Sequence, residues 1–514
     1  MNITQWIIFF LILNIIHGLG TWKFYKKAGV EAWKAFIPFL NMYELMKIIN
    51  RPVWWMIFVY IPIVNLLMIP TLWVQLIGVF GKKSTKDKIL AVITLGLYVA
   101  YLNYFEVDKL TYDPGHQNEK DTLIGSLVFA IIAATIVHTF LIQPYKIPTG
   151  SLEKTLLIGD YLFVSKMHYG ARVPMTTIST PMVHDTLPLI HKKSYLKFPQ
   201  LPYMRLPGLQ KIKRNEIVVF NWPADTVKYF FQKDAAQYKP IDKKSHYVKR
   251  CVAVPGDTLK IDKGKIYING KPTEYPDRTY LQRVYKVTTK PDMPFTRSTL
   301  QRLMKNYGVG LERVSENFDV ALMNLTDEAL KTVKNLSNVE KVELLDVGKG
   351  QMYGGNPNWD INNFGPLYVP KKGDTIKLTP QNYLLYKDII EKYDEHDKYH
   401  KVHNHKLSRK GNEFFLDGKP VKDYVIKQDY YFMMGDNRSN SEDSRFWGFV
   451  PFDHVVGKPV FIFYSSGPEG VRWDRVFTTV MGKGERVSYL IPFLVLVGLY
   501  YIFSAYRSRK RKSE

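Results

Sequence analysis

A serine that directly follows a glycine is the first feature that could do chemistry. Residues 147–156 read IPTGSLEKTL and carry Ser151. A serine hydroxyl becomes a nucleophile at neutral pH when a base takes its proton. Lys154 follows with the spacing S-x-x-K, which β-lactamases and penicillin-binding proteins use. Lys249 lies farther along the chain, within YVKRCVAVPGD. The first question is therefore which lysine would serve as the base.

The immediate neighbours of the two lysines favour the distant one. A free lysine has a pKa of ~10.4 and is charged at pH 7. Burial among apolar groups lowers that pKa, so that the neutral amine can accept a proton. Lys249 follows Tyr247 and Val248 in an expected buried strand. Lys154 follows Glu153, whose negative charge favours the ammonium form, and the chain contains no K-T-G element. The residues therefore favour Lys249 as base, with Lys154 as the alternative.

A third stretch completes a pattern. Residues 434–451 read MGDNRSNSEDSRFWGFVP. The three stretches, in this order and after an apolar segment, resemble the type I signal peptidase family of serine proteases. The resemblance covers about 144–265 and 412–470. It implies a Ser-Lys dyad with Ser151 as nucleophile and Lys249 as general base. The implied substrates are exported preproteins, from which N-terminal signal peptides are removed.

The resemblance also implies roles for neighbouring residues. Thr149 and the backbone N–H of Ser151 match the oxyanion hole, which stabilises charge in the transition state. Ser441 matches the serine that orients the lysine. Leu152 and Lys154 stand where the family usually has Met and Pro, so substrate preference is expected to differ more than the chemistry. The expected supporting residues are Asp443, Arg445 and Arg250, and the expected substrate pocket is lined by Ile147, Pro148, Leu152, Tyr247 and Val248.

Composition narrows the class of partner. The chain has 514 residues, a formal net charge of +24 and 46% hydrophobic residues. No zinc-finger or other nucleic-acid recognition motif accompanies the basic charge, so we expect no nucleic-acid partner. The apolar runs favour a lipid bilayer instead. The single cysteine, Cys251, excludes an internal disulfide framework.

Five segments are candidates for membrane spans, which need about 20 mainly apolar residues. They are 6–19, 54–80, 89–104, 123–142 and 487–506. Positive charge marks the cytoplasmic side, so 23–51 and the basic tail are expected inside. Five spans then place 144–486 outside, in a multi-pass protein of the cytoplasmic (inner) membrane. Lys82, Lys83, Lys86 and Lys88 would also fall outside, against the charge rule. Segment 54–80 fits either one kinked span or a re-entrant hairpin.

The expected fold is a multi-pass α-helical membrane anchor joined to a mostly-β extracytoplasmic catalytic domain of signal-peptidase type, with an inserted α+β subdomain. Short strands are expected at 161–165, 216–221, 258–261, 265–268, 430–434 and 460–464. In the insert, strands at 284–288, 318–325 and 341–347 alternate with helices at 297–306 and 327–336, behind Thr296 and Thr326. The expected domains are a multi-span region 1–120 of unassigned role, a transmembrane helix 121–143, a peptidase core 144–270 and 412–486, the insert 271–411, a transmembrane helix 487–507 and a basic cytoplasmic tail 508–514.

Several residues could mislead. Residues 396–400 read HDKYH, one methylene short of the zincin motif H-E-x-x-H, but lie among lysines, so a charged helix end is the simpler interpretation. Cys251 is expected to be a buried hydrophobe, His138 to pack against another helix, and Asp160 to form a turn. No metal or organic cofactor is implied.

Two other functions stay open. One is a penicillin-binding acyltransferase that uses Ser151 and Lys154. The other is a catalytically inactive membrane assembly factor, against which the retained Ser151, Lys249 and Ser441 argue. The expected partners are secretory preproteins and the bilayer, and contact with the export machinery is a further expectation.

Overall fold

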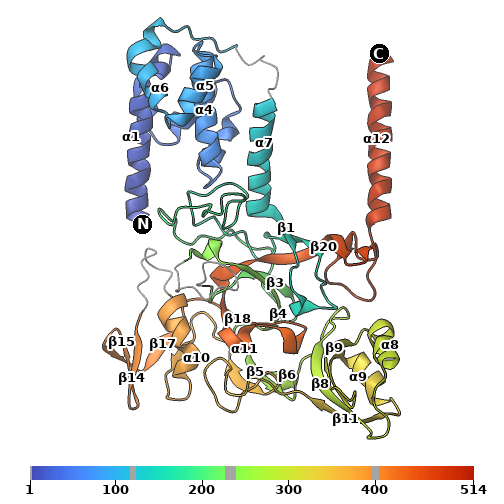
Figure 1. Ribbon diagram of the computed structural model, residues 1–514. Helices are drawn as coiled ribbons and strands as arrows, with labels where there is room; N and C mark the ends of the chain where they lie inside the picture. Colours follow the sequence, from blue (N-terminus) through green and yellow to red (C-terminus); the bar gives the residue numbers. More distant parts are fainter. Residues whose placement is uncertain (1–2, 116–122, 226–238, 395–404, 514) are drawn as a thin grey trace.

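The computed structural model describes residues 3–115, 123–225, 239–394 and 405–513. Helices gather on one side of a mostly-β domain, and α12 (Leu490–Ser513) stands apart from the others (Figure 1). The predicted combination of a helical region with a mostly-β domain is therefore confirmed.

A nine-stranded antiparallel sheet forms the centre of the β domain. Its main path runs β1-β2-β20-β3-β4-β18-β19, and β21 and β22 pair with β20. The bounds are β1 Ile142–Lys146, β2 Asp160–Ser165, β3 Ile217–Asn221, β4 His246–Ala253, β18 Tyr430–Met434, β19 Val450–Pro451, β20 Val455–Gly467, β21 Gly470–Val471 and β22 Thr478–Thr479. These strands include every one predicted for 161–165, 216–221, 430–434 and 460–464.

Strand β3 shows why this sheet lies inside the domain. All five of its residues are buried. Ile217 and Val219 enter one hydrophobic cluster with Leu152 and Leu162, whereas Val218 and Phe220 enter a second cluster on the other side. Successive side chains of a strand point to opposite faces, so a continuous apolar run fits a sheet covered on both faces.

A second β region packs beside this sheet around a large core, to which β4 and β18 of the central sheet also contribute side chains. Strands β12-β5-β6-β7 form one sheet, β13 pairs with β17, and β14-β15-β16 form a third. The bounds are β5 Thr258–Asp262, β6 Lys265–Ile268, β7 Lys271–Pro272, β12 Phe364–Tyr368, β13 Thr375–Lys377, β14 Leu407–Lys410, β15 Glu413–Leu416, β16 Lys419–Val421 and β17 Asp423–Val425, with helix α10 at Tyr383–Asp388 and helix α11 at Ser444–Trp447.

The predicted insert forms a compact unit over a shorter stretch. Its sheet has the order β11-β8-β10-β9 and its own core, covered by α8 and α9. The elements are β8 Gln282–Thr289, α8 Arg297–Tyr307, β9 Gly310–Val314, β10 Val320–Thr326, α9 Asp327–Lys334 and β11 Val339–Leu344. The chain order is β-α-β-β-α-β, one strand more than predicted. Strand β12, also within 271–411, pairs with β5 instead of with this sheet.

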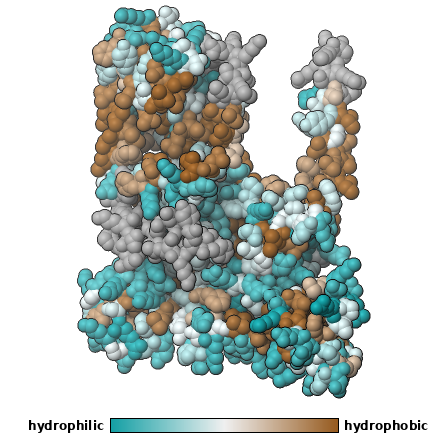
Figure 2. All heavy atoms as spheres, viewed as in Figure 1, coloured by the Kyte–Doolittle hydropathy of each residue, from teal (hydrophilic) through white to brown (hydrophobic). Residues whose placement is uncertain are grey.

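The N-terminal region is helical. Its helices are α1 Ile3–Lys27, α2 Leu40–Ile48, α3 Met56–Val59, α4 Asn65–Val79, α5 Thr85–Ile93 and α6 Leu97–Tyr101, followed by α7 Leu123–Ile136. Within the described residues, α1 is the helix long and apolar enough to cross a membrane. Shorter apolar helices are Asn65–Val79, Gly125–Leu141 and Leu490–Ala505. Apolar side chains form a band across these helices (Figure 2).

Two of the five predicted spans are not continuous helices. Segment 89–104 is broken: Thr85–Ile93 and Leu97–Lys109 meet at 111°. Segment 54–80 breaks before α4, where Ile63 has a left-handed φ of 71°. The Arg51 Nε donates to Gln75 Oε1 at 3.0 Å, so the start of this segment lies beside the end of α4. Segment 54–80 therefore begins and ends at the same end of the helical region, as in the re-entrant alternative.

The re-entrant path of segment 54–80 also changes the expected side of the lysines that conflicted with the charge rule. Lys82 pairs with Glu106, and the Lys27 Nζ donates to the backbone carbonyl of Asp108 at 2.7 Å. Lys82 therefore lies at the same end of the helical region as the C-terminal end of α1. In Figure 1 that end points away from the β domain. This geometry separates Lys82 from the β domain, whereas the five-span prediction put both on one side of the membrane. It favours the re-entrant alternative, which agrees with the charge rule.

Candidate active site

Ser151 lies in a short 3-10 turn, Gly150–Leu152, between β1 and β2. Asn437 holds this turn: its backbone N–H donates to the Ser151 carbonyl at 3.1 Å, and its Nδ2 donates to the Gly150 carbonyl at 3.1 Å. The Asn324 Nδ2 of β10 in turn donates to Asn437 Oδ1 at 2.9 Å. The turn thus depends on the loop after β18, and that loop on the inserted sheet.

Gly435 makes the close approach of this loop possible. A Cβ at this position would lie 2.5 Å from the Ser151 carbonyl oxygen and would overlap the Ser441 hydroxyl. Real Cβ atoms do not approach backbone so closely, so only glycine fits. Strand β18 pairs with β4, with Met434 opposite Arg250, and the next residue, Gly435, therefore comes beside Lys249. The Ser151 turn, the Ser441 side chain and the Lys249 strand converge on this point.

Lys249 is buried in β4, with 4% of its surface exposed. Burial lowers its pKa to about 8, against the opposing attraction of Asp443. Its Nζ lies 5.7 Å from the centroid of the Tyr247 ring. At a pKa of about 8, roughly a tenth of the amine is neutral at pH 7, compared with well below 0.1% for a free lysine. The environment therefore suits a general base.

The dyad hydrogen bond is not formed in this conformation. Strand β4 packs against the turn that carries Ser151. Among the described residues, however, no hydrogen bond joins Ser151 Oγ to Lys249 Nζ, and the Ser441 Oγ is buried without a hydrogen-bond partner. Catalytic hydrogen bonds often tighten only when substrate is bound. The fold thus brings the Ser151 turn and the Lys249 strand together, but the hydrogen bond between the two side chains is not formed.

Lys154 points to a different part of the molecule. Its backbone has a left-handed φ of 69°. Its Nζ reaches the C-terminal end of α8, where a Cβ on Gly308 would overlap it. A cation is favoured at a helix C-terminus, where carbonyl groups lack partners. Lys154 is thus engaged with the inserted unit, and this geometry disfavours it as the base.

Two buried arginine–carboxylate pairs support the loop. Arg250 binds Asp436 through two hydrogen bonds of 2.7 and 2.6 Å. Arg445 donates to Asp443 at 2.9 and 2.8 Å, and Asp443 also accepts the Gly435 N–H at 3.1 Å. Burial would raise the pKa of Asp443, but the charge and hydrogen bonds of Arg445 outweigh it and lower that pKa. The carboxylate therefore stays charged beside the lysine strand.

The expected pocket residues occupy two faces of the sheet. Ile147 and Leu152 are buried together, with Val248 packed against them. Tyr247 packs in the other cluster, with its ring stacked on Trp222 at 5.1 Å. Pro148 is exposed. Thr149, the expected oxyanion donor, is also exposed and makes no capping hydrogen bond to the turn.

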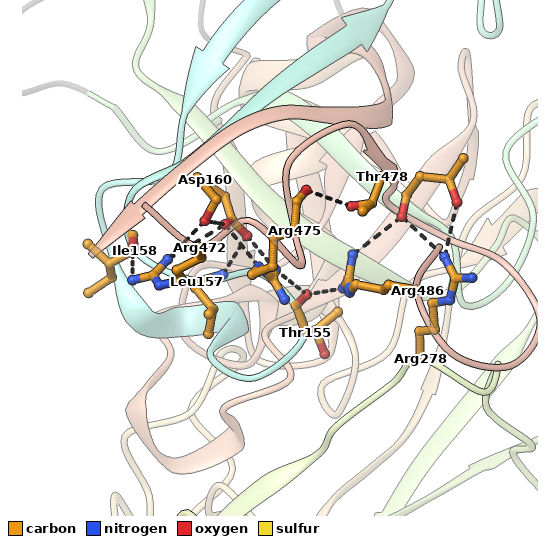
Figure 3. Close-up of polar contacts among 11 residues, drawn as sticks. Thr155, Leu157, Ile158, Asp160, Arg278, Arg472, Arg475, Thr478 and Arg486 are labelled. Atoms are coloured by element: carbon orange, nitrogen blue, oxygen red, sulfur yellow. Dashed lines mark hydrogen bonds and ion pairs between the residues drawn. The ribbon is translucent and has the colours of Figure 1, made fainter. Parts of the chain in front are cut away.

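Asp160 has a structural role. Its carboxylate is fully buried and pairs with Arg475 at 2.5 Å and with the Ser465 hydroxyl at 2.7 Å (Figure 3). The Arg475 and Arg486 side chains both donate to the Thr155 carbonyl, at 3.3 and 2.6 Å. The segment after β20 thereby fixes the residues between Ser151 and β2.

The structure also describes two of the other residues that could be mistaken for catalytic or metal-binding groups. Cys251 is fully buried, its thiol donates to the Ala253 carbonyl at 3.4 Å, and burial raises its pKa, so it is no nucleophile. Within the described ranges no group of three His, Cys, Asp or Glu side chains could hold a metal ion. His396 and His400 lie outside the described residues. His138 lines a cavity at the foot of α7.

Sequence reasoning missed the residues that hold the site together. Asn437 stands inside the quoted stretch MGDNRSNSEDSRFWGFVP, where an Asn flanked by matched charges was a visible signal. Arg475 and Arg486 carry no local signal of this role, because their contacts with Asp160 and Thr155 join residues more than 300 positions apart.

These observations define a β-domain protein with apolar helices, in which a serine turn and a buried lysine converge. Residues 121–353 and 369–464 match the family described as "Signal peptidase, peptidase S26". This match covers well over half of the chain, which therefore belongs to that family. Residues 33–112 match a "Family of unknown function (DUF5684)".

Similar proteins include three that are named Signal peptidase I. The protein of Buchnera aphidicola subsp. Acyrthosiphon pisum is 25% identical over 69% of this chain and 80% of its own length. That of Haemophilus influenzae is 24% identical over 73% of this chain and 79% of its own. That of Helicobacter pylori strain 26695 is 24% identical over 70% of this chain and 92% of its own. The predicted family is confirmed.

Proposed function

We propose that this protein is a membrane-bound serine endopeptidase that removes N-terminal signal peptides from exported preproteins. The observation that carries the proposal is the buried Lys249, with its pKa lowered to about 8, on the strand that packs against the Ser151 turn. Family membership supports the substrate class, since the family is that of signal peptidases. Lys154 at the end of α8 disfavours the penicillin-binding alternative.

The proposed reaction proceeds through an acyl-enzyme. Neutral Lys249 takes the proton of Ser151 as the oxygen attacks the scissile carbonyl carbon. Thr149 Oγ1 and the Ser151 N–H stabilise the oxyanion that forms. Lys249 then gives its proton to the leaving amine as the C–N bond breaks. Lys249 then takes a proton from water as the water attacks the ester, and returns this proton to the Ser151 oxygen as the ester C–O bond breaks, which frees the acid product and the serine.

We place the β domain on the extracytoplasmic side of the cytoplasmic membrane. The helices extend from one face of this domain, so a substrate held in the bilayer would reach the Ser151 turn from that face (Figure 1). Lys26 and Lys27 end α1 at the far side, and the basic tail follows α12 at the same side, as positive charge inside requires.

Cleavage of a model preprotein by purified variants tests the proposal. Ser151→Ala and Lys249→Ala should each abolish cleavage, because each removes a partner in proton transfer. Lys154→Ala should keep most of the activity, since its amine contacts α8, and it serves as the matched lysine control. Folding is checked by circular dichroism. A folded Lys154→Ala protein without activity, beside an active Lys249→Ala protein, would reverse the assignment.

A further inference from the structure

A cavity of about 150 Å³ lies where α7 meets the β domain. Residues from the foot of α7, the turn at Ile63, the loop after β2 and the start of β4 line it. Most of its ionisable lining consists of basic residues, of which His184 and His246 are neutral at pH 7 because burial lowers their pKa. The basic residues are Lys166, Arg172, Lys243, His138, His184 and His246, and the carboxylate among the described lining residues is that of Asp242.

The carboxylate oxygens of Asp242 already accept hydrogen bonds from other residues. Its Oδ2 accepts the backbone N–H groups of Met175 and Thr176 at 3.0 and 2.9 Å. Its Oδ1 accepts the Thr176 hydroxyl at 2.7 Å. No ion pair joins Asp242 to a lining cation within the described part of the chain. The carboxylate thus fixes the loop and forms no direct ion pair with a described cation of the cavity, although its charge still acts on Arg172 and Lys243 from a distance.

Two of the cations bind only neutral groups. The Arg172 guanidinium donates to the Asp453 backbone carbonyl and to Asn221 Oδ1, both at 2.7 Å. The Lys243 ammonium donates to the Ser179 hydroxyl at 2.6 Å. Neutral acceptors orient these side chains but do not cancel their charge.

The side chain of Lys166 has no hydrogen-bond or ion-pair partner in the part of the chain that the structure describes, although it lines the cavity. Burial, and next the charge of Arg172, lower its pKa to about 7. A cation that is desolvated beside other cations is costly unless an anion accompanies it. The cavity therefore gathers Lys166, Arg172 and Lys243 without a direct ion pair to any of them among the described residues, so an anion bound there would favour the charged form of Lys166.

We propose that this cavity binds the phosphate group of an anionic ligand, either a phospholipid headgroup or free phosphate. Arginine and lysine bind phosphate oxygens through charge-assisted hydrogen bonds, and Lys166 has all its donors available. The cavity is smaller than the roughly 300–1,000 Å³ of drug-sized ligand sites, so it suits a single small anion.

The position of the cavity gives a lipid phosphate access. Thr135, His138 and Thr139 of its wall belong to the last turns of α7 and its continuation, directly before β1. Figure 1 shows this junction on the face of the β domain from which the helices extend. Under the proposed topology it lies at the level of lipid headgroups. The binding itself does not depend on peptidase activity.

Isothermal titration of the full chain in maltoside detergent at pH 7 tests the site with inorganic phosphate, against sodium chloride of equal ionic strength. Nanodiscs of phosphatidylcholine with and without phosphatidylglycerol test the lipid source through the thermal unfolding midpoint. Lys166→Met keeps the length of the side chain and removes its charge. Lys192→Met, exposed in the same loop, is the matched control.

We expect wild type and Lys192→Met to bind equally and Lys166→Met to bind at least tenfold more weakly. Lys243→Gln should also bind more weakly and replaces Lys166→Met if that variant does not fold. Response to phosphate alone, or to phosphatidylglycerol alone, identifies the source. Equal responses from wild type, Lys166→Met and Lys243→Gln, or no response of wild type to either probe, would overturn the proposal.

Discussion

Lys249 should control the pH dependence of cleavage. Only its neutral form can accept the Ser151 proton, and burial lowers its pKa to about 8. The neutral fraction grows as pH rises, so kcat/KM should climb about tenfold per pH unit below 8 and level off above it. The measurement is kcat/KM from pH 6 to 10 with a peptide that spans a signal cleavage site. A flat profile, with product release excluded as the slow step, would mean that Lys249 does not titrate as the base.

Ser441 provides a second test at the residue scale. Its hydroxyl is buried without a hydrogen-bond partner, which costs about 1–3 kcal/mol. Ser441→Ala removes that cost, so the thermal unfolding midpoint should hold or rise. If the hydroxyl orients Lys249 when substrate is bound, kcat should fall more than KM rises. An unchanged kcat would exclude Ser441 from the site while leaving the Ser151–Lys249 pair in place.

The choice between two lysines shows what local sequence can and cannot predict. Tyr247 and Val248 predict a buried strand, and the structure buries Lys249 in β4. The position of Lys154 could not be predicted, because its contact at Gly308 joins distant segments through the packing of the inserted unit. The pKa of Lys249 is lowered by burial, and the residues next to it in the sequence partly predict that burial.

The segment after β20 should contribute strongly to stability. Arg475 is the buried partner of the fully buried Asp160 carboxylate. Arg475→Met leaves that charge without its main counter-ion, which should cost about 3–5 kcal/mol. Arg472→Met is the matched control, since Arg472 is more exposed and lies 3.7 Å from the same carboxylate. Denaturant unfolding of both variants gives the two values. Equal small losses would show that the buried pair is not a main support.

Helices were predicted correctly where an N-capping threonine marks their first turn. Helices α8 and α9 begin behind Thr296 and Thr326, whose hydroxyls accept the N–H groups of Thr299 and Ala329. Strand β9, which reads GLERV, was missed. It lies at the edge of its sheet with two exposed charged residues at its centre. An edge strand has less need of apolar residues, so its sequence signal is weak.

At the scale of the whole molecule, hydropathy alone could not distinguish a membrane span from a re-entrant hairpin. Residues 54–80 are apolar enough to cross a bilayer, yet Arg51 contacts Gln75 near the end of α4. Such a contact depends on the tertiary fold, and no window of sequence contains it. The return changes the expected side of Lys82. Because Lys82 also pairs with Glu106, the broken segment 89–104 returns to the same side, so two crossings are lost and the expected sides of 144–486 and of the tail stay unchanged.

Cysteine labelling with an impermeant maleimide distinguishes the two topologies. Single cysteines are placed in a Cys251→Ala background at Lys83, Lys349 and Ser508. Lys349, exposed in the β domain, should label in intact cells if this domain is extracytoplasmic. Ser508, in the tail, should label only after lysis. Lys83 decides between the arrangements: the re-entrant return places it inside with Lys27, so it should label only after lysis, whereas five spans place it outside. Labelling of Lys83→Cys in intact cells would restore the five-span arrangement, and labelling of Lys349→Cys only after lysis would contradict the topology and the proposed function together.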